Sequence, residues 1–300
     1  MLTTYLMLLA MATLWGGTFI AGRLIGASVD PYSAAFLRFA IASACLWLLT
    51  LASERSIPRL TGRQAFSVLL LGLTGIFAYN IFFFRGLETV HAGQAAAVIA
   101  MNPAVIALLS MILFGERGGF VRLVGIGLSL IGALIVISNG RPLALLEGGL
   151  GAGRLDIVMC VFSWVAYSLI GKRVLTGLSP LVSVTYASTA GMLMLAWPVW
   201  THSAVAHWSG YGSVDWSSLV YLGLGGTVIG FVWYYKGIQR IGAMRASVFI
   251  NFVPVSAILL GHLVLGEAVG WPLALGALLV ITGVYLTNRP ATGRTALKTG

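Results

Sequence analysis

Long apolar runs alternate with short polar interruptions along the whole chain. Ten runs of about 20 residues hold few charges, and each is bounded by charged residues, glycine or proline. A helix of that length spans the hydrocarbon core of a bilayer, because it rises about 1.5 Å per residue. The pattern predicts ten transmembrane helices, at approximately 4–24, 32–52, 65–85, 92–114, 121–138, 155–174, 181–201, 217–237, 245–266 and 271–288.

The composition makes lipid the solvent for most of the surface. Of the 300 residues, 59% are hydrophobic and 9% are charged, whereas soluble domains average about 25% charged residues. So few charges cannot cover a soluble core of this size, and the same numbers exclude a disordered chain and a coiled coil. The net charge of +10 does not indicate a nucleic-acid partner, because the basic residues stand singly or in pairs at the ends of apolar runs.

The basic residues also predict the orientation. With a cytoplasmic N-terminus, 13 Lys and Arg fall on the cytoplasmic side, and only Arg23, Arg85, Arg141 and Arg154 fall outside. Short cytoplasmic loops of membrane proteins are enriched in Lys and Arg. An even number of spans then puts the C-terminus in the cytoplasm as well.

An internal repeat predicts the architecture. A shift of 151 residues aligns a series of small and special residues without a gap, and a shift of 149 pairs Trp15 with Trp164 in the earlier part of each copy. The longer series lays Gly75, Gly86, Pro103, Gly115 and Glu116 on Gly226, Gly237, Pro254, Gly266 and Glu267. We expect five-helix repeats at 1–138 and 155–288, a connecting loop at 139–154 and a cytoplasmic tail at 289–300.

Five is an odd number, so the second copy enters the membrane from the opposite face. The expected fold is an all-α integral membrane protein, with ten transmembrane helices arranged as two inverted five-helix repeats around a central cavity. Two similar halves of opposite orientation can exchange conformations and thereby open the cavity to either side of the membrane. This symmetry favours a transporter that works by alternating access.

Four motifs resemble those of a known family. They are LWGGTF at 14–19, FLRF at 36–39, NPAVIALLSMILFGE at 102–116 and its repeat VPVSAILLGHLVLGE at 253–267. In this order and spacing the chain resembles the EamA branch of the drug/metabolite transporter superfamily over essentially its whole length. Within that branch it is similar to the YddG-type bacterial aromatic amino acid exporters. The resemblance implies a ten-helix carrier of the bacterial inner membrane with a cavity at the repeat interface.

Prolines and glycines at matched positions are candidate hinges. Pro103 and Pro254 lie near the middle of spans four and nine, where each removes a backbone donor and frees the carbonyl four residues earlier. They predict either a hinge facing the cavity or a static kink. Gly86 and Gly237 allow close helix packing and could also assist the motion.

Aromatic residues gather on spans one, three, six and eight. Phe83 and Tyr234 belong to matched aromatic triplets, and we expect both to face the protein rather than lipid. An interfacial aromatic belt is the alternative. Ring contacts favour an aromatic ligand by about 0.5 to 1.5 kcal/mol each beyond area burial. The candidate aromatic substrate contacts are Trp15, Tyr79, Phe83, Trp164, Tyr167 and Tyr234, with Met101 beside them.

Polar residues inside the spans complete the candidate site. Asn80, Asn102, Asn251 and His262 align with Phe231, Val253, Ala100 and Met111 in the other repeat, so the symmetric scaffold does not require them. They predict contacts to a zwitterionic solute or, alternatively, interhelical hydrogen bonds. His262 is either a proton-linked switch or a buried neutral side chain bonded to a neighbouring helix.

Charged residues near the spans have mainly structural interpretations. Arg38 is expected to bond backbone carbonyls and reach toward the outer surface, although it could instead anchor a carboxylate. Glu116 and Glu267 close spans four and nine, where they could cap neighbouring helices or form gate contacts. No carboxylate lies deep in a span, which favours uniport or weak coupling through His262.

The sequence favours export of aromatic amino acids and related amphipathic metabolites by alternating access. A broader drug, metabolite or amino acid efflux carrier is the alternative, and a non-transporting membrane receptor or interaction protein is the candidate from another class. An enzyme would need His, Asp or Glu clustered at a membrane face, which the sequence lacks. We therefore expect a monomer without metal or cofactor, whose partners are a small-molecule substrate and the lipid bilayer.

Overall fold

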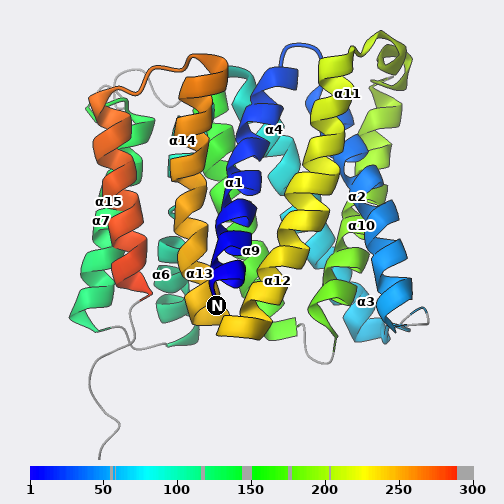
Figure 1. Cartoon of the computed structure of the whole chain (residues 1–300), viewed down its shortest axis with the longest axis horizontal. Coiled ribbons are helices and arrows are strands. Elements are labelled where there is room, and N and C mark those ends of the chain that lie inside the picture. Colours follow the sequence, from blue (N-terminus) through cyan, green and yellow to red (C-terminus); the bar gives the residue numbers. More distant parts are fainter. Residues whose placement is uncertain are drawn as a thin grey trace, which may run out of the picture.

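Helices are the only regular elements in the part of the chain that the structure describes. The computed structural model describes residues 1–54, 57, 59–115, 119–143, 151–174, 178–202 and 204–288. Within these ranges nine helical segments are long and apolar enough to span a membrane, and a tenth apolar helix, α15 (Trp271–Thr287), has 17 residues. They stand side by side (Figure 1). The expected all-helical membrane fold is confirmed.

The first half of the chain forms five membrane-spanning units. Their elements are α1 (Leu2–Ile25), α2 (Pro31–Glu54), α3 (Gly62–Leu71), the π-helical η1 (Gly72–Ala78), α4 (Tyr79–Thr89), α5 (Ala92–Ile99), α6 (Asn102–Phe114) and α7 (Phe120–Ile137). α3, η1 and α4 are continuous and make one span, as do α5 and α6 together.

The second half repeats this order. It consists of α9 (Ala152–Val174), α10 (Pro180–Thr201), the short η2 (Ala204–Gly210), α11 (Ser213–Val220), the π-helical η3 (Tyr221–Ile229), α12 (Gly230–Ile241), α13 (Ala243–Val248), the 3₁₀ turn η4 (Phe249–Asn251), α14 (Phe252–Leu265) and α15. Spans three and eight are longer than the expected 65–85 and 217–237. They run from Gly62 to Thr89 and from Ser213 to Ile241.

The longer third and eighth spans each contain a π-helical segment at matched positions. A shift of 151 lays η1 within η3. Both segments are rich in glycine, and a threonine hydroxyl in each bonds back to its own helix, from Thr74 to the carbonyl of Leu70 and from Thr227 to the carbonyl of Leu222. π-Helical turns often mark functional sites, because they re-aim the side chains around them.

Reciprocal contacts between α7 and α15 show that the repeats are inverted. A Cβ on Gly125 would lie 2.6 Å from the carbonyl oxygen of Gly283, and one on Gly132 would lie 2.6 Å from that of Gly276. The two helices therefore run antiparallel through glycine contacts, which let their backbones approach closely. Since Gly125 corresponds to Gly276 and Gly132 to Gly283, each contact maps onto the other under the repeat operation.

Equivalent close contacts also join the two repeats at the centre. A Cβ on Gly86 would meet the side chain of Ile157 at 2.5 Å, and a Cβ on Gly237 would meet Leu8 at the same distance. Leu8 and Ile157 are equivalent under the shift of 149. Helix α4 therefore packs on α9 of the other repeat as α12 packs on α1, and these four helices form part of the repeat interface.

Spans four and nine are interrupted just before each proline, near the middle of the span, where the sequence predicts a hinge or a static kink. Pro103 lies in the first turn of α6 and Pro254 in the first turn of α14. Before Pro103 the helix tightens, and the N–H of Met101 bonds the carbonyl of Val98 at 3.1 Å. The interruption follows because proline lacks an N–H and clashes with the preceding turn, whereas the first turn of a new helix tolerates it.

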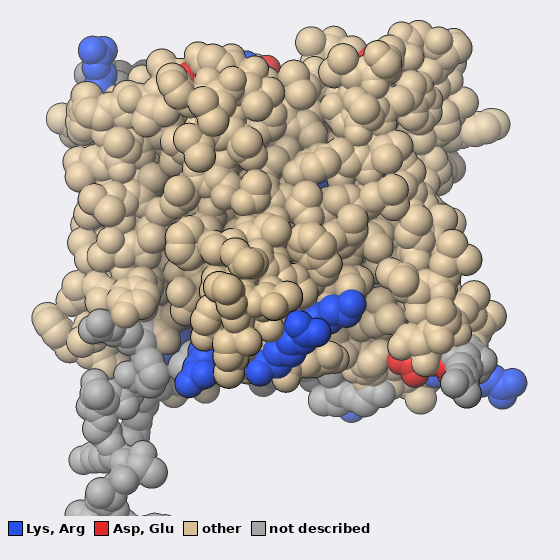
Figure 2. Space-filling model, in the orientation of Figure 1, with Lys and Arg blue, Asp and Glu red and all other residues tan. Residues whose placement is uncertain are grey.

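Charge is distributed unevenly between the two ends of the molecule. On the face shown in Figure 2, Lys and Arg gather along the edge near the N-terminus, and the surface between the two ends is almost uncharged. The connecting loop is described only at 139–143 and 151–154, and the tail from 289 lies outside the described residues. We call the end opposite the N-terminus the distal end.

Candidate functional site

Arg38 lies at the centre of a polar contact between the two repeats. Its Nη1 donates to Asn80 Oδ1 on α4 at 3.0 Å, and its Nε donates to Thr227 Oγ1 on η3 at 3.2 Å. Both acceptors are held in place, because Asn80 Nδ2 bonds the carbonyl of Ile76 at 2.8 Å and the Thr227 hydroxyl bonds that of Leu222 at 2.9 Å. The expectation that Arg38 bonds backbone carbonyls and reaches the outer surface is therefore wrong. The π-helical turn provides an interior partner instead.

The positive charge of Arg38 has no carboxylate partner among the described residues. Its two hydrogen-bond acceptors are neutral, and its Nη2 has no protein acceptor in this part of the chain. The described acids lie in loops or near span ends, at Asp30, Glu54, Glu88, Asp156, Asp215 and Glu267. Ionisable groups at membrane depth are costly, so an arginine that is not neutralised there indicates a functional site.

One aromatic cluster joins α4 to α9. The ring of Trp164 lies 5.4 Å from that of Tyr79 and 5.1 Å from that of Tyr167. Tyr79 also stacks on Phe83 at 5.9 Å, and Phe83 packs edge-to-face on Phe19 at 5.2 Å. The sequence expectation that Phe83 faces the protein agrees with its burial, but its 1% exposure leaves no surface for a ligand in this conformation.

A second aromatic cluster joins α1 to α12. Trp15 lies 5.5 Å from both Phe231 and Tyr234, and its Nε1 donates to the carbonyl of Gly226 in η3 at 2.9 Å. Tyr234 in turn lies 6.2 Å from Tyr235. The two clusters therefore occupy related places on the repeat interface, although their rings differ.

Several of these side chains are not fully buried. Arg38, Tyr79, Tyr167 and Tyr235 each keep part of their surface accessible. An open groove of about 270 Å³ lies between α1, α11 and α14, and its lining is mainly apolar.

The break between α5 and α6 holds an unpaired amide. Asn102 is 7% exposed, and its Oδ1 is buried without a hydrogen-bond partner. Met101 beside it is partly buried, as is Asn251 in the corresponding turn η4. A buried acceptor without a donor costs about 1 to 3 kcal/mol, so Asn102 is a polar group that a ligand or another conformation could satisfy.

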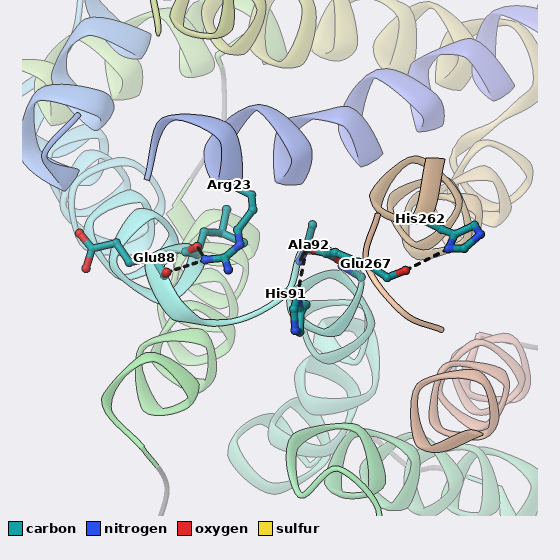
Figure 3. Close-up of polar contacts among 8 residues, drawn as sticks. Arg23, Glu88, His91, Ala92, His262 and Glu267 are labelled. Atoms are coloured by element: carbon teal, nitrogen blue, oxygen red, sulfur yellow. Dashed lines mark hydrogen bonds and ion pairs between the residues drawn. The ribbon is translucent and has the colours of Figure 1, made fainter. Parts of the chain in front are cut away.

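Two charged side chains join neighbouring helix ends at the distal end (Figure 3). Glu267, which follows α14, accepts the N–H of Ala92 at 2.8 Å and that of Gly93 at 3.2 Å, and His91 Nδ1 lies 3.5 Å from its Oε1. The carboxylate thus caps the N-terminus of α5, where unpaired N–H groups and the helix dipole favour an anion.

Arg23 makes the complementary contact at the same end. From α1 its Nη1 donates to the carbonyls of Leu87, at 2.7 Å, and of Glu88, in the last turn of α4. A guanidinium suits the unpaired carbonyls at a helix C-terminus. Arg23 and Glu267 therefore tie the connection between α4 and α5 to a helix of each repeat. We call this pair the distal latch.

One residue of the predicted site lies elsewhere than the sequence indicates, and another is outside the described residues. His262 is exposed, and its Nδ1 lies 3.0 Å from the backbone oxygen of Glu267 in the loop after its own helix. The expectation of a buried histidine bonded to a neighbouring helix is wrong, because its position on α14 faces away from the interface. Glu116 lies outside the described residues.

Sequence reasoning missed Thr227, Tyr235 and Phe231. Thr227 carries a hydroxyl in the middle of span eight and aligns with the apolar Ile76 of the other repeat. The candidate asparagines were recognised by the same difference between the two repeats. Phe231 aligns with Asn80, so equivalent positions hold a polar contact in one repeat and a ring contact in the other. No pattern in the sequence distinguishes Tyr235 from lipid-facing tyrosines.

Comparisons with known proteins agree with this architecture. The family model described as "EamA-like transporter family" matches residues 2–138 and 152–289. An "Uncharacterized transporter YyaM" of Bacillus subtilis (strain 168) is 29% identical over 96% of this chain and 94% of its own. A "Probable terminal-alkyne amino-acid exporter" of Streptantibioticus cattleyicolor is 29% identical over 93% of this chain and 91% of its own.

A solved crystal structure superposes with a TM-score of 0.62. It is 22% identical in sequence and covers 95% of this chain and 98% of its own. At this level of identity the similarity concerns the fold alone.

Proposed function

Because the chain belongs to the EamA-like transporter family, we propose that it exports aromatic amino acids and related amphipathic metabolites by alternating access. We propose that the protein has a substrate specificity similar to that of the YddG-type exporters. We place its site in an interior space at the repeat interface, beside the partly exposed Arg38, Tyr79 and Tyr167. The protein is a multi-pass membrane transporter, and we place it in the inner membrane of a bacterium as a monomer.

One observation carries the proposal. Aromatic side chains of both repeats, Tyr79 and Trp164, pack together beside a guanidinium that keeps accessible surface, because Arg38 bonds Asn80, the residue after Tyr79. The apolar part of an amphipathic solute can stack on Tyr79 and Trp164, while its polar part meets Arg38. A cavity that served only apolar drugs would not need a charged side chain whose burial is costly.

The distal latch gives the proposal a direction. We place the N-terminal end in the cytoplasm, because Lys and Arg gather there (Figure 2). The latch between Glu267, Arg23 and the α4–α5 connection then closes the outer side of the protein. Export requires that this latch opens after the solute has entered from the cytoplasm, and the interrupted spans four and nine provide the hinges at Pro103 and Pro254.

One relative supports an amino acid substrate. The Streptantibioticus protein carries the description "Probable terminal-alkyne amino-acid exporter", which names an amino acid as the exported solute. A broader efflux carrier for drugs or other amino acids is the second candidate, and the mainly apolar lining of the groove between α1, α11 and α14 favours it.

Transport into proteoliposomes tests the proposal. Purified full-length protein is reconstituted, and uptake of labelled phenylalanine is competed with tryptophan, tyrosine, leucine and threonine. We expect tryptophan and tyrosine to compete at least tenfold better than threonine. Competition by threonine as strong as that by tryptophan contradicts the aromatic specificity, and the absence of uptake of every amino acid contradicts transport of this class.

A further inference from the structure

We propose that Arg38 binds the carboxylate of the transported solute, so that the site selects carboxylate-bearing compounds over amines of the same shape. This inference rests on the proposed transport function and names the group that its site recognises.

The hydrogen bonds of Arg38 leave donors available. A guanidinium has five N–H groups, and the bonds to Asn80 and Thr227 use one each on Nη1 and Nε. Both hydrogens of Nη2 and one of Nη1 remain without a protein acceptor in the described chain. A planar group with adjacent donors matches the two oxygens of a carboxylate, which is the geometry of bidentate Arg–carboxylate pairs.

The electrostatics favour an anion. The contacts of Arg38 are two neutral oxygens and the Phe39 ring, whose centroid lies 5.3 Å from Cζ. No anion among them neutralises its charge, which therefore persists in an interior of low dielectric constant. The cost of removing this guanidinium from water is paid when the protein folds. A carboxylate that enters gains a partner already held in position by α4 and η3, whereas an ammonium without a carboxylate meets a like charge.

The neighbouring rings fix where the rest of the solute lies. Tyr79 precedes Asn80 on α4, and its ring packs on Trp164 of α9. A solute whose carboxylate is on Arg38 therefore has its side chain within reach of the Tyr79–Trp164–Tyr167 cluster. The solute would contact α2 and α4 of one repeat and α9 of the other, so its binding is coupled to their relative position.

A second interpretation gives Arg38 a purely structural role, in which it fastens α2 to α4 and η3. The two interpretations differ in what they predict for Asn80. Asn80→Asp places a carboxylate of nearly the same shape 3.0 Å from Nη1, which strengthens the fastening but neutralises the charge. Asn80→Ala removes the same contact and leaves the charge free.

The test compares these variants in proteoliposomes. Uptake of labelled phenylalanine is competed with 3-phenylpropionate, which lacks the amine, and with phenethylamine, which lacks the carboxylate. In the unmodified protein we expect phenylpropionate to compete roughly tenfold better than phenethylamine. Asn80→Asp should reduce the apparent affinity for phenylpropionate and phenylalanine about tenfold or more, without lowering the melting temperature and without weakening phenethylamine. Asn80→Ala should retain the preference for the carboxylate.

The opposite ranking of the two Asn80 variants overturns the inference that Arg38 binds the carboxylate. If Asn80→Asp transports phenylalanine normally and Asn80→Ala does not, Arg38 acts as a fastener. Equal competition by phenylpropionate and phenethylamine in the unmodified protein also overturns it. Arg38→Lys, which retains a charge but not the planar fork, should keep a weakened preference for the carboxylate.

A parallel series separates this inference from the aromatic specificity. Uptake of leucine and competition by its amine, 3-methylbutylamine, are measured with the same variants. If leucine is transported in a manner that depends on Arg38 while phenylalanine is not transported, the carboxylate site is supported and the aromatic specificity is contradicted. If the carboxylate compound is not preferred over its amine in either series, the carboxylate site is contradicted, whichever solute is transported.

Discussion

The carboxylate of Glu267 accepts the backbone N–H of Ala92 at 2.8 Å, which joins the end of α14 in the second repeat to the start of α5 in the first. Both residues are buried, so water competes little for the contact. Because the contact crosses between the repeats, it holds only while α5 and the end of α14 remain together. It is therefore suited to distinguish a closed distal end from an open one.

Weakening this contact should open the distal end. Glu267→Gln keeps one acceptor oxygen but removes the charge that the α5 N-terminus favours, at a cost of about 0.3 to 2 kcal/mol. Spin labels on the exposed positions Glu88 and Val269, in a background with Cys45 and Cys160 replaced, report the separation of the two sides. We expect the distribution of distances to shift to longer values.

His262→Ala is the matched control. This histidine contacts only the backbone oxygen of Glu267 among the contacts described for it, so its removal leaves both carboxylate contacts intact. The latch is not a determinant of closure if His262→Ala and Glu267→Gln change the distances equally, or if neither changes them.

The Trp164 ring should contribute to the affinity for aromatic solutes. Trp164→Leu removes the ring contacts with Tyr79 and Tyr167, and we expect the apparent affinity for phenylalanine to fall about 2- to 10-fold. Trp197→Leu changes a tryptophan that is 75% exposed on α10 and should leave the affinity unchanged. Equal effects of the two substitutions in competition assays would mean that Trp164 acts through general packing.

We expect the native Asn102 side chain to lower the stability of the protein while it supports transport. Its buried Oδ1 has no donor, so Asn102→Leu removes an unpaired acceptor and should raise the free energy of unfolding by about 1 to 3 kcal/mol. We expect a higher melting temperature together with slower uptake. Asn251→Leu changes a partly exposed amide and should give little gain in stability. A stabilised Asn102→Leu protein with normal uptake would exclude Asn102 from the transport cycle.

The prolines at the interrupted spans should affect rate more than affinity. Pro103→Ala restores an N–H in the first turn of α6, which lets α5 and α6 approach a continuous helix. We expect the maximal uptake rate to fall several-fold while the half-saturating concentration stays nearly constant. Pro198→Ala, inside α10, serves as the control. A normal rate for Pro103→Ala, or an equal loss for Pro198→Ala, contradicts a hinge at α5–α6.

The fold could be predicted from the sequence because its signals are periodic or symmetric. Apolar runs of membrane-spanning length identify the ten spans, and matched residues such as Gly86 and Gly237 identify the repeat whose contacts the structure shows. The ends of spans three and eight were less predictable. Polar residues such as Asp215 lie inside the terminal turn of α11, where composition alone suggests a loop.

The site could be predicted only in part, because the rotation of an apolar helix leaves little trace in its sequence. Asn80, whose equivalent in the other repeat is apolar, correctly indicated a polar contact. Its partner Arg38 could not be assigned from the sequence, because the second acceptor of Arg38 lies in the π-helical η3. His262 illustrates the opposite case. Its polarity suggested the interior, whereas the structure leaves it exposed.

A crystallographic map of the protein bound to 4-iodophenylalanine shows where the solute binds, because iodine locates the ring by its anomalous signal. We expect an iodine peak beside Tyr79 and Trp164, with the carboxylate of the ligand at Arg38 Nη2. A peak only in the open groove between α1, α11 and α14, with Arg38 unchanged, would contradict an interior site at the repeat interface.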